Sequence, residues 1–307
     1  MMRYLRWGYL TILLQWIHLC AEPLHLVWQV DRERIWETDW ILELLSGYEI
    51  EEIIDGHFEE MRDQSLVVIC GDPGDYFNQM REMNYRFGVI HLSDETYSHP
   101  TEFYPLADFV LRNYWHKKFL DQKNVSFIAL GYKNGFWRGS SRPSIHDAID
   151  RHYDWSFAGQ IGSHSTRGVM VSSMKQIPNY YIHEIFTWND STSLSPTAYR
   201  DLMLDSIFIP CSRGYFNLDS FRVYEALECG CIPIVEKTPF DYFQSLFGDH
   251  PFIAVDSWEE APELVDELLD DWDRLEERRQ ACYQWWLDYK KQARNQIRAL
   301  IQNHLDI

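Results

Sequence analysis

The segment CSRGYFNLDSFRVYEALECGCIPIV, residues 211–235, decides how the rest of the chain is interpreted. An apolar run over 207–211 predicts a buried strand, and the polar stretch after it predicts a loop. Residues 219–220 are of the types that cap a helix N-terminus, and Gly230 is typical of a helix end before a second apolar strand at 232–235. This order predicts a parallel-sheet unit in which a helix N-terminus can receive phosphate oxygens.

Three charged residues of this segment fit an anionic ligand. Arg213 lies in the loop, where its guanidinium could make a bidentate contact with a diphosphate. Arg222 and Glu225 are three residues apart and project from one face of the helix, so that the carboxylate could bind ribose hydroxyls. The alternative is a plain ion pair between Arg222 and Glu225 on a solvated helix face.

Outward from this segment, apolar runs alternate with amphipathic stretches along most of the chain. This rhythm predicts βαβ units and an α/β fold with two parallel sheets. The alternation pauses once, in a stretch rich in Gly, Ser and Pro, and it gives way to a charged helical pattern near the C-terminus. The predicted parts are a first Rossmann-like domain at 22–135, a linker at 136–150, a second domain at 151–257 and a helical segment at 258–307.

Composition restricts the partners. The chain has 307 residues and a formal net charge of −19, which argues against nucleic acid or an anionic membrane surface as the main partner. A small phosphorylated ligand is compatible with this charge because a few arginines suffice to bind it. Six cysteines without paired CxxC spacing favour reduced thiols, although a bridge between distant members stays open.

The N-terminus allows several interpretations. Residues 1–20 combine two arginines with an apolar stretch of about 13 residues. A packed surface helix, a targeting signal and a membrane anchor all fit, so the compartment is left open between cytoplasmic and membrane-associated.

The 211–235 segment also resembles a known pattern. The exostosin-type glycosyltransferases carry a stretch close to C-P-R-G followed by D-S-F-R-x-Y-E-A-L-x-x-G-C-I-P-V. Upstream, FAGQIGSHSTR at 157–167 resembles the F-x-G segment and following arginine of that superfamily. Fifteen positions of the main segment fit: Cys211, Arg213, Gly214, Asp219, Ser220, Phe221, Arg222, Tyr224, Glu225, Ala226, Leu227, Gly230, Cys231, Ile232 and Pro233.

The resemblance implies two facing Rossmann-like domains of the GT-B type, a long C-terminal helix, and inverting transfer of a sugar from a nucleoside-diphosphate donor to a glycan or other hydroxyl-bearing acceptor. The first half, over 88–115 and 127–136, is similar to the ribitol xylosyltransferase-like branch. Ser212 replaces the usual proline and residues 215–218 replace a more glycine-rich loop, which leaves the donor open. The donor-binding residues implied are Gly159, Arg167, Arg213, Ser220, Arg222 and Glu225.

Inverting transfer needs a base, which we expect in the loop HLSDETYSHP that follows an apolar strand of the first domain. Of its residues, Asp94 or Glu95 is the predicted catalytic base, and the alternative is a carboxylate that orders the loop. His91 and His99 lie in the same loop. Asp72, in a glycine- and proline-containing turn, is a second candidate whose alternative is a simple turn.

No metal or other cofactor is expected. Residues 271–273 read Asp-Trp-Asp, a pattern that metal-dependent transferases of another fold use after a buried strand, but here it lies in a helical acidic run. Cys229 and Cys231 flank a helix end, where packing is the simpler role than ligation. Two other functions stay open: a nucleotide-sugar-binding or scaffold protein without activity, and a two-domain sugar-binding protein without nucleotide.

Overall fold

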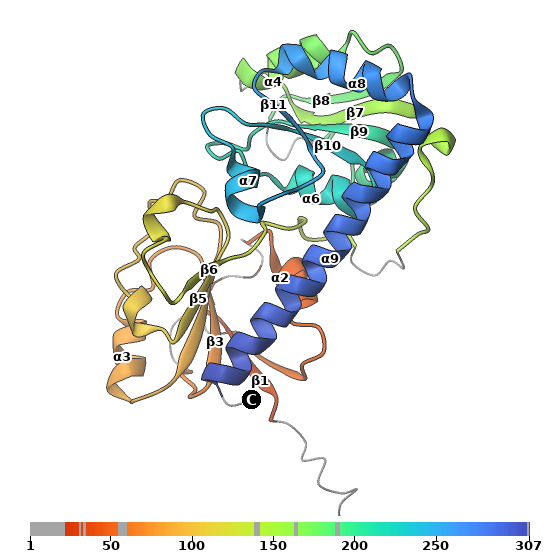
Figure 1. Ribbon diagram of the computed structural model, residues 1–307. Coiled ribbons are helices and arrows are strands. Elements are labelled where there is room, and N and C mark those ends of the chain that lie inside the picture. The colour runs from red at the N-terminus through yellow and green to blue at the C-terminus, as the bar shows by residue number, and fades with distance from the viewer. Residues whose placement is uncertain are drawn as a thin grey trace, which may run out of the picture.

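The computed structural model describes residues 22–30, 32, 35–54, 60–137, 142–162, 165–187, 191–305 and 307. The apolar segment at 1–21 lies outside these ranges. The described chain forms two α/β halves, one above the other in Figure 1, with a long helix running along both. Within the described ranges, no helix combines the length and the apolar character needed to cross a bilayer.

The first half contains a six-stranded sheet in the order β2-β1-β3-β4-β5-β6, with every pair parallel. Strands β3 and β4 are buried at every residue, as expected for central strands of a parallel sheet covered on both faces. The strands are β1 (Leu24–Trp28), β2 (Ile50–Ile54), β3 (Ser65–Ile69), β4 (Phe87–His91), β5 (Phe109–Arg112) and β6 (Val125–Phe127), with helices α2 (Thr38–Leu44) and α3 (Tyr76–Glu82) and short 3-10 turns η1 (Tyr104–Leu106) and η2 (Lys117–Phe119).

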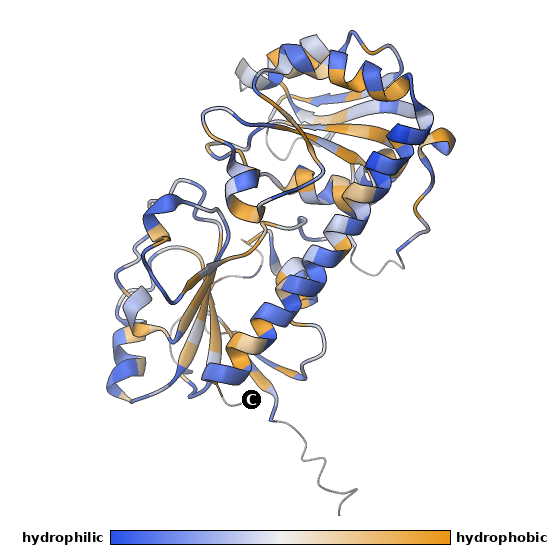
Figure 2. Cartoon of the chain, in the orientation of Figure 1, coloured by the Kyte–Doolittle hydropathy of each residue, from blue (hydrophilic) through white to orange (hydrophobic). Residues whose placement is uncertain are grey.

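The second half contains a five-stranded parallel sheet in the order β11-β10-β9-β7-β8. Strands β9 and β10 are fully buried, and Figure 2 shows apolar residues along the strands and polar residues on the outer helices. Its elements are η3 (Ala148–Asp150), β7 (Tyr153–Gln160), α4 (Ser165–Met174), β8 (Tyr180–Ile185), α5 (Pro196–Leu204), β9 (Ser206–Cys211), α6 (Phe221–Glu228), β10 (Ile232–Glu236), α7 (Tyr242–Phe247), β11 (Ile253–Val255), η4 (Trp258–Glu260) and α8 (Ala261–Leu269).

Helix α9 (Trp272–His304) connects the halves, running from the second sheet to the first (Figure 1). Its buried Lys290 lies 2.6 Å from Glu228 of α6 and 3.4 Å from Glu43 of α2. The Tyr289 hydroxyl accepts a hydrogen bond of 2.7 Å from the Ala129 amide in the first half. The helix therefore fixes one half against the other through charged and polar contacts that are shielded from water.

The α/β fold predicted from the alternating pattern is confirmed, including the long C-terminal helix. The 211–235 segment folds as expected: β9 is followed by a loop, then α6 with Ser220 at its N-cap, and Gly230 at φ +64° after its end. Cys70, Cys211, Cys229, Cys231 and Cys282, the described cysteines, have free thiols. The exact domain boundaries at 135, 150 and 257 stay predictions.

Candidate functional site

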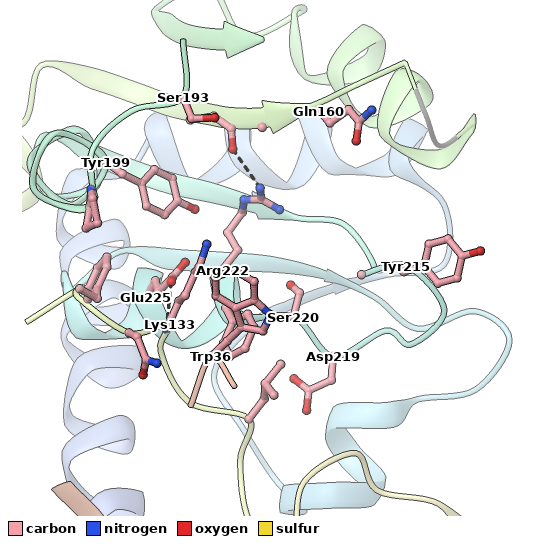
Figure 3. Close-up of a pocket in the computed structure, with 18 of the residues that line it drawn as sticks. Trp36, Lys133, Gln160, Ser193, Tyr199, Tyr215, Asp219, Ser220, Arg222 and Glu225 are labelled. Atoms are coloured by element: carbon pink, nitrogen blue, oxygen red, sulfur yellow. Dashed lines mark hydrogen bonds between the residues drawn. The ribbon is translucent and has the colours of Figure 1, made fainter. Parts of the chain in front are cut away.

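A cavity of about 720 Å³ lies between the two halves (Figure 3). The first half lines it with segments that follow β1, β4, β5 and β6, and the second half with the ends of β7 and β8, the loop after β9 and the start of α6. In open parallel sheets, ligands bind beyond the carboxyl ends of strands where the chain turns to opposite sides. Strands β7 and β9 are such neighbours: the chain continues from β7 to β8 on one side of this pair and from β9 to β10 on the other.

The first turn of α6 brings a cation into this cavity. Arg222 donates a hydrogen bond of 3.0 Å to the Ala158 carbonyl, and its guanidinium carbon lies 4.5 Å from the centre of the Phe157 ring. Its Nε is buried without a hydrogen-bond partner among the described residues, and so is the Oγ of Ser220 at the N-cap. Unsatisfied buried donors at a helix N-terminus are what an anionic ligand would satisfy.

Arg167, in the first turn of α4, adds a second cation. It donates to the carbonyls of Gln160 at 3.1 Å and Arg213 at 3.2 Å, while its Nε is also buried without a partner among the described residues. Burial and the nearby Arg222 charge lower the pKa of Arg167 to about 10. Both guanidinium groups therefore stay positively charged at neutral pH, held near each other on one side of the cavity.

Gly159, at the end of β7, makes room for Arg222. Its φ is +151°, and a Cβ built on it would lie 2.9 Å from the Nη2 of Arg222. A side chain here would be strained and would push the guanidinium out of place. The requirement for glycine is thus explained by the position of Arg222.

Glu225, one turn further along α6, closes the cavity toward the first half. Its Oε1 accepts a hydrogen bond of 3.2 Å from the Lys133 amide, a contact between the halves that Figure 3 shows. Burial raises the pKa of Glu225, while the Lys133 amide and Arg222 favour its ionised form. The Lys133 ammonium lies 4.0 Å from the centre of the Trp36 ring, which lines the same cavity.

Asp219, directly before the α6 N-cap, is a buried carboxyl on the cavity wall. Burial raises its pKa to about 7, although the Tyr242 hydroxyl donates a hydrogen bond of 3.1 Å to its Oδ2. The same hydroxyl accepts a hydrogen bond of 2.8 Å from the Trp115 amide. The protonation of Asp219 is thereby connected to a polar contact between the two halves.

On the opposite side, the first half contributes Glu37, located between β1 and α2. Ser93 Oγ donates to both carboxylate oxygens at 2.9 and 3.1 Å, Asn113 donates to Oε1 at 3.0 Å, and the Trp36 amide donates to Oε2 at 2.9 Å. Burial raises the pKa of Glu37, while these hydrogen bonds favour the carboxylate. Such an environment brings a carboxylate closer to the pKa of an effective proton acceptor.

A comparison with protein families finds a match over the second half of the chain. The family model described as RXYLT1 C-terminal domain matches residues 137–305, more than half of the chain. The chain belongs to this family. The matched range contains β7 to α9, and therefore every cavity residue contributed by the second half.

The curated relatives are similar over about half of this chain. Ribitol-5-phosphate xylosyltransferase 1 of Homo sapiens is 25% identical over 182 residues, which are 52% of this chain and 39% of that protein. The Danio rerio protein of the same name is 23% identical over 172 residues, 50% of this chain and 39% of that protein. The matches thus span about two fifths of the length of these relatives.

Solved structures show the same fold. An α1,3-fucosyltransferase with GDP superimposes with a TM-score of 0.51 at 14% identity, over 91% of this chain and 92% of that chain. Anabaena Alr3699/HepE, in complex with UDP and glucose, gives a TM-score of 0.52 at 7% identity, over 91% of this chain and 100% of that chain. The chain has the GT-B type of α/β fold.

Most of the donor-binding residues predicted from the sequence lie at the cavity. Gly159, Arg167, Ser220, Arg222 and Glu225 all line it. Arg213 lies elsewhere: it donates to Glu236 Oε2 at 3.1 and 2.7 Å through Nε and Nη2, and its side chain is not part of the lining. Its backbone carbonyl nevertheless receives the hydrogen bond from Arg167.

The two predicted bases have different surroundings. Asp94 is buried outside the cavity lining, where it accepts hydrogen bonds from Arg112 at 3.1 Å and from the amides of Ser98 and His99 at 2.8 and 3.1 Å. This favours the alternative role of ordering the loop. Glu95 lines the cavity, but its Oε1 is hydrogen-bonded to two amides of the loop after β9.

Within the described ranges, one group has metal-ligand spacing: His91, Asp94 and His99. His91 Nε2 lies 3.0 Å from His99 Nδ1, and Arg112 contacts Asp94, so these side chains already satisfy one another. The Asp-Trp-Asp pattern lies at the start of α9: Asp271 is the N-cap and accepts a hydrogen bond of 3.1 Å from the Arg274 amide, while Trp272 and Asp273 are the first residues of the helix.

Two smaller expectations concern turn chemistry. Asp72 accepts a hydrogen bond of 2.8 Å from the Gly74 amide, which is the simple turn considered as its alternative. Asp219 and Ser220 were the two predicted N-cap residues of α6; Ser220 takes that position, and Asp219 lies directly before it on the cavity wall.

Sequence reasoning missed Glu37. The stretch IWETDWILELL has helical periodicity, which hides a residue that lies before the helix begins at Thr38. The signal that could have found it is its place directly after the first strand of a βαβ unit, at the carboxyl edge where ligands bind.

Proposed function

We propose that this protein is a glycosyltransferase that moves a sugar from a nucleoside-diphosphate donor to a hydroxyl group of an acceptor, with inversion at the anomeric carbon and without an obligatory metal. One observation carries this proposal. Arg167 and Arg222 present buried Nε donors that have no hydrogen-bond partner among the described residues, beside the α6 N-terminus, while Glu37 lines the same cavity from the other half. The first set fits a diphosphate and the second fits a proton acceptor.

The proposed reaction is a single displacement. The acceptor hydroxyl transfers its proton to Glu37 as its oxygen bonds to the anomeric carbon, and the bond between that carbon and the diphosphate oxygen breaks. The diphosphate leaves with the electron pair, and its added charge is stabilised by Arg167, Arg222 and the helix N-terminus. Attack from the side opposite the leaving group inverts the configuration. Glu225 is placed to hold ribose hydroxyls.

Support for the donor comes from the comparisons. Structures of the same fold are named as complexes with GDP and with UDP, and the curated relatives are named as xylosyltransferases acting on ribitol-5-phosphate. A pentosyl donor and a polyol or glycan acceptor are therefore the first substrates to test.

The experiment incubates the purified protein with UDP- and GDP-sugars, with and without polyol phosphate and glycan acceptors. Release of UDP or GDP that depends on the acceptor, and that persists in a chelator, is the expected result. Proton NMR of the product should show the opposite anomeric configuration to the donor. If nucleotides bind but no donor turns over with any acceptor, the protein is a nucleotide-sugar-binding protein and the proposed activity is wrong. If no nucleotide binds, the proposed function is wrong and the alternative is a two-domain sugar-binding protein without nucleotide.

A further inference from the structure

The loop between β9 and α6 holds an acidic side chain of the opposite half. Glu95, in the connection after β4, accepts hydrogen bonds through one oxygen, Oε1, from the amides of Phe216 at 2.7 Å and Asn217 at 3.0 Å. We name these two groups the 216–217 amide pair. Glu95 and the neighbouring Gly214 and Tyr215 line the cavity, so this contact forms part of its wall.

Consecutive amides that converge on one oxygen form a concavity for an anion. The 216–217 amide pair is continuous with the cationic side of the cavity. Arg167 donates to the carbonyl of Arg213 in the same loop, and the loop leads into the α6 N-cap, where Ser220 Oγ has no partner among the described residues. The pair thus belongs to the part of the cavity that attracts negative charge, yet a carboxylate of the protein fills it.

The loop is shaped closely around that carboxylate. A Cβ on Gly214 would lie 2.6 Å from Glu95 Oε1, so any other residue would displace the acid. Beside it, the side-chain amide of Asn217 donates a hydrogen bond to the Tyr97 hydroxyl, and the Tyr97 ring meets the Phe216 ring edge-on with centroids 6.4 Å apart. These contacts place an acid of the first half in the anion-binding concavity of the second.

A carboxylate in this position opposes an incoming anion. Asp219 lies on the same wall, and its pKa is raised first by burial and also by the Glu95 charge, so a second negative charge is already unfavourable here. A diphosphate drawn to Arg167 and Arg222 adds more negative charge and offers oxygens that suit the same amides. Two anions cannot occupy one pair of amides.

We propose that the 216–217 amide pair is a phosphate-oxygen subsite, and that Glu95 fills it in the ligand-free protein and withdraws when a diphosphate binds. This inference rests on the proposed function, since it assigns a diphosphate to the same cavity. It makes Glu95 an internal competitor for the site and leaves proton acceptance to Glu37.

The test measures binding by calorimetry with three probes: inorganic pyrophosphate, UDP and GDP. Glu95→Gln keeps the size and the acceptor oxygen of the side chain but removes its charge. The matched control is Glu102→Gln, in the same connection between β4 and β5, where the exposed Glu102 accepts from the Thr101 amide at 2.9 Å. We expect Glu95→Gln to bind pyrophosphate, and UDP or GDP if the wild type binds them, about tenfold more tightly. The reason is that a neutral glutamine side chain accepts hydrogen bonds from the two amides less strongly than a carboxylate does. Glu102→Gln should match the wild type.

Three results separate this inference from the proposed function. If the wild type binds UDP or GDP and Glu95→Gln binds it with the same or lower affinity, the competition is overturned and the proposed function stands. Pyrophosphate that binds Glu95→Gln more tightly while neither protein binds a nucleotide supports the subsite and overturns the function. Affinity unchanged in Glu95→Gln, with turnover lowered by a hundredfold or more, would show that Glu95 is the base and overturn the inference.

Discussion

The two halves bring opposite chemistry to one cavity. The second half presents Arg167, Arg222 and a helix N-terminus, and the buried Nε atoms of both arginines lack a hydrogen-bond partner in the part of the chain that the structure describes. The first half presents Glu37, whose pKa burial raises, and Glu95, which reaches across to the opposite loop. In the proposed function, one half holds an anion, and the other accepts a proton through Glu37 or competes for the anion's place through Glu95. A reaction that needs both therefore depends on the fixed placement that helix α9 provides.

The largest expected effect concerns the first half. Glu37→Gln preserves the size of the side chain but removes its basicity, so turnover should fall by about 10²- to 10⁴-fold, the usual contribution of a general base. The dissociation constants of UDP and GDP should stay within about twofold of wild type, because the anion is held by the other half. Steady-state kinetics and calorimetry check the two parts. Equal losses in turnover and in nucleotide affinity would show that proton acceptance and anion binding are not divided between the two halves.

The next effect is on stability and is carried by Asp219. Its pKa is raised from 3.8 to about 7 on folding, so between these pH values the folded state holds a proton that the unfolded state has lost. The resulting contribution to the unfolding free energy is fully present below pH ~4 and is lost as pH rises through 7. The loss amounts to about 4 kcal/mol. Asp219→Asn should flatten the fall in unfolding free energy between pH 4 and 8 in the ligand-free protein.

Denaturant unfolding at a series of pH values measures this slope. Asp121→Asn, at an exposed surface position, is the control and should keep the wild-type slope. An unchanged slope in Asp219→Asn would show that the carboxyl is ionised throughout this range.

The second half is tested by its cation. Arg222→Met keeps a long apolar stem against Phe157 but removes the charge, and should weaken UDP or GDP binding by about 10- to 100-fold, the value of one hydrogen bond to a charged group. Arg62→Met, which removes an exposed cation 3.5 Å from Glu60, is the matched control. If both variants bind like wild type in calorimetry, the anion is held elsewhere.

The smallest effect is on the glycine that makes room for this cation. Gly159→Ala should lower the unfolding free energy by about 1–3 kcal/mol and weaken nucleotide binding severalfold, because it strains the backbone and crowds Arg222. Gly168→Ala is the control: it lies in helix α4 with nothing within 4 Å of a new Cβ, so it should be neutral or slightly stabilising. Thermal unfolding with and without UDP distinguishes them.

The sequence predicted the fold well because the fold depends on local patterns. Apolar runs such as those of β3 and β4 are buried on both faces, and Gly230 ends α6 where a positive φ is needed. Among the cavity residues of the second half, Arg222 and Glu225 follow from the helix phase. Gly159 and Arg167 were implied by the resemblance to the exostosin-type pattern and not by local periodicity.

What the sequence could not predict depends on contacts between distant residues. Arg213 turns to Glu236, 23 residues away, and Asp94 turns to Arg112, because these partners meet only in the folded sheet. Glu37 was hidden because helical periodicity extends past the start of α2. Local pattern identifies the edge on which a side chain lies, but only packing decides whether it faces the cavity or another side chain.

The central claim is that a diphosphate binds between the α6 N-terminus and the arginines of the second half. A crystal structure of the protein with UDP or GDP tests it most directly. We predict diphosphate oxygens within hydrogen-bond distance of Arg167 and Arg222 and at the 216–217 amide pair, with Glu95 moved away. A nucleotide bound outside this cavity, or a diphosphate that contacts neither arginine, would contradict the account.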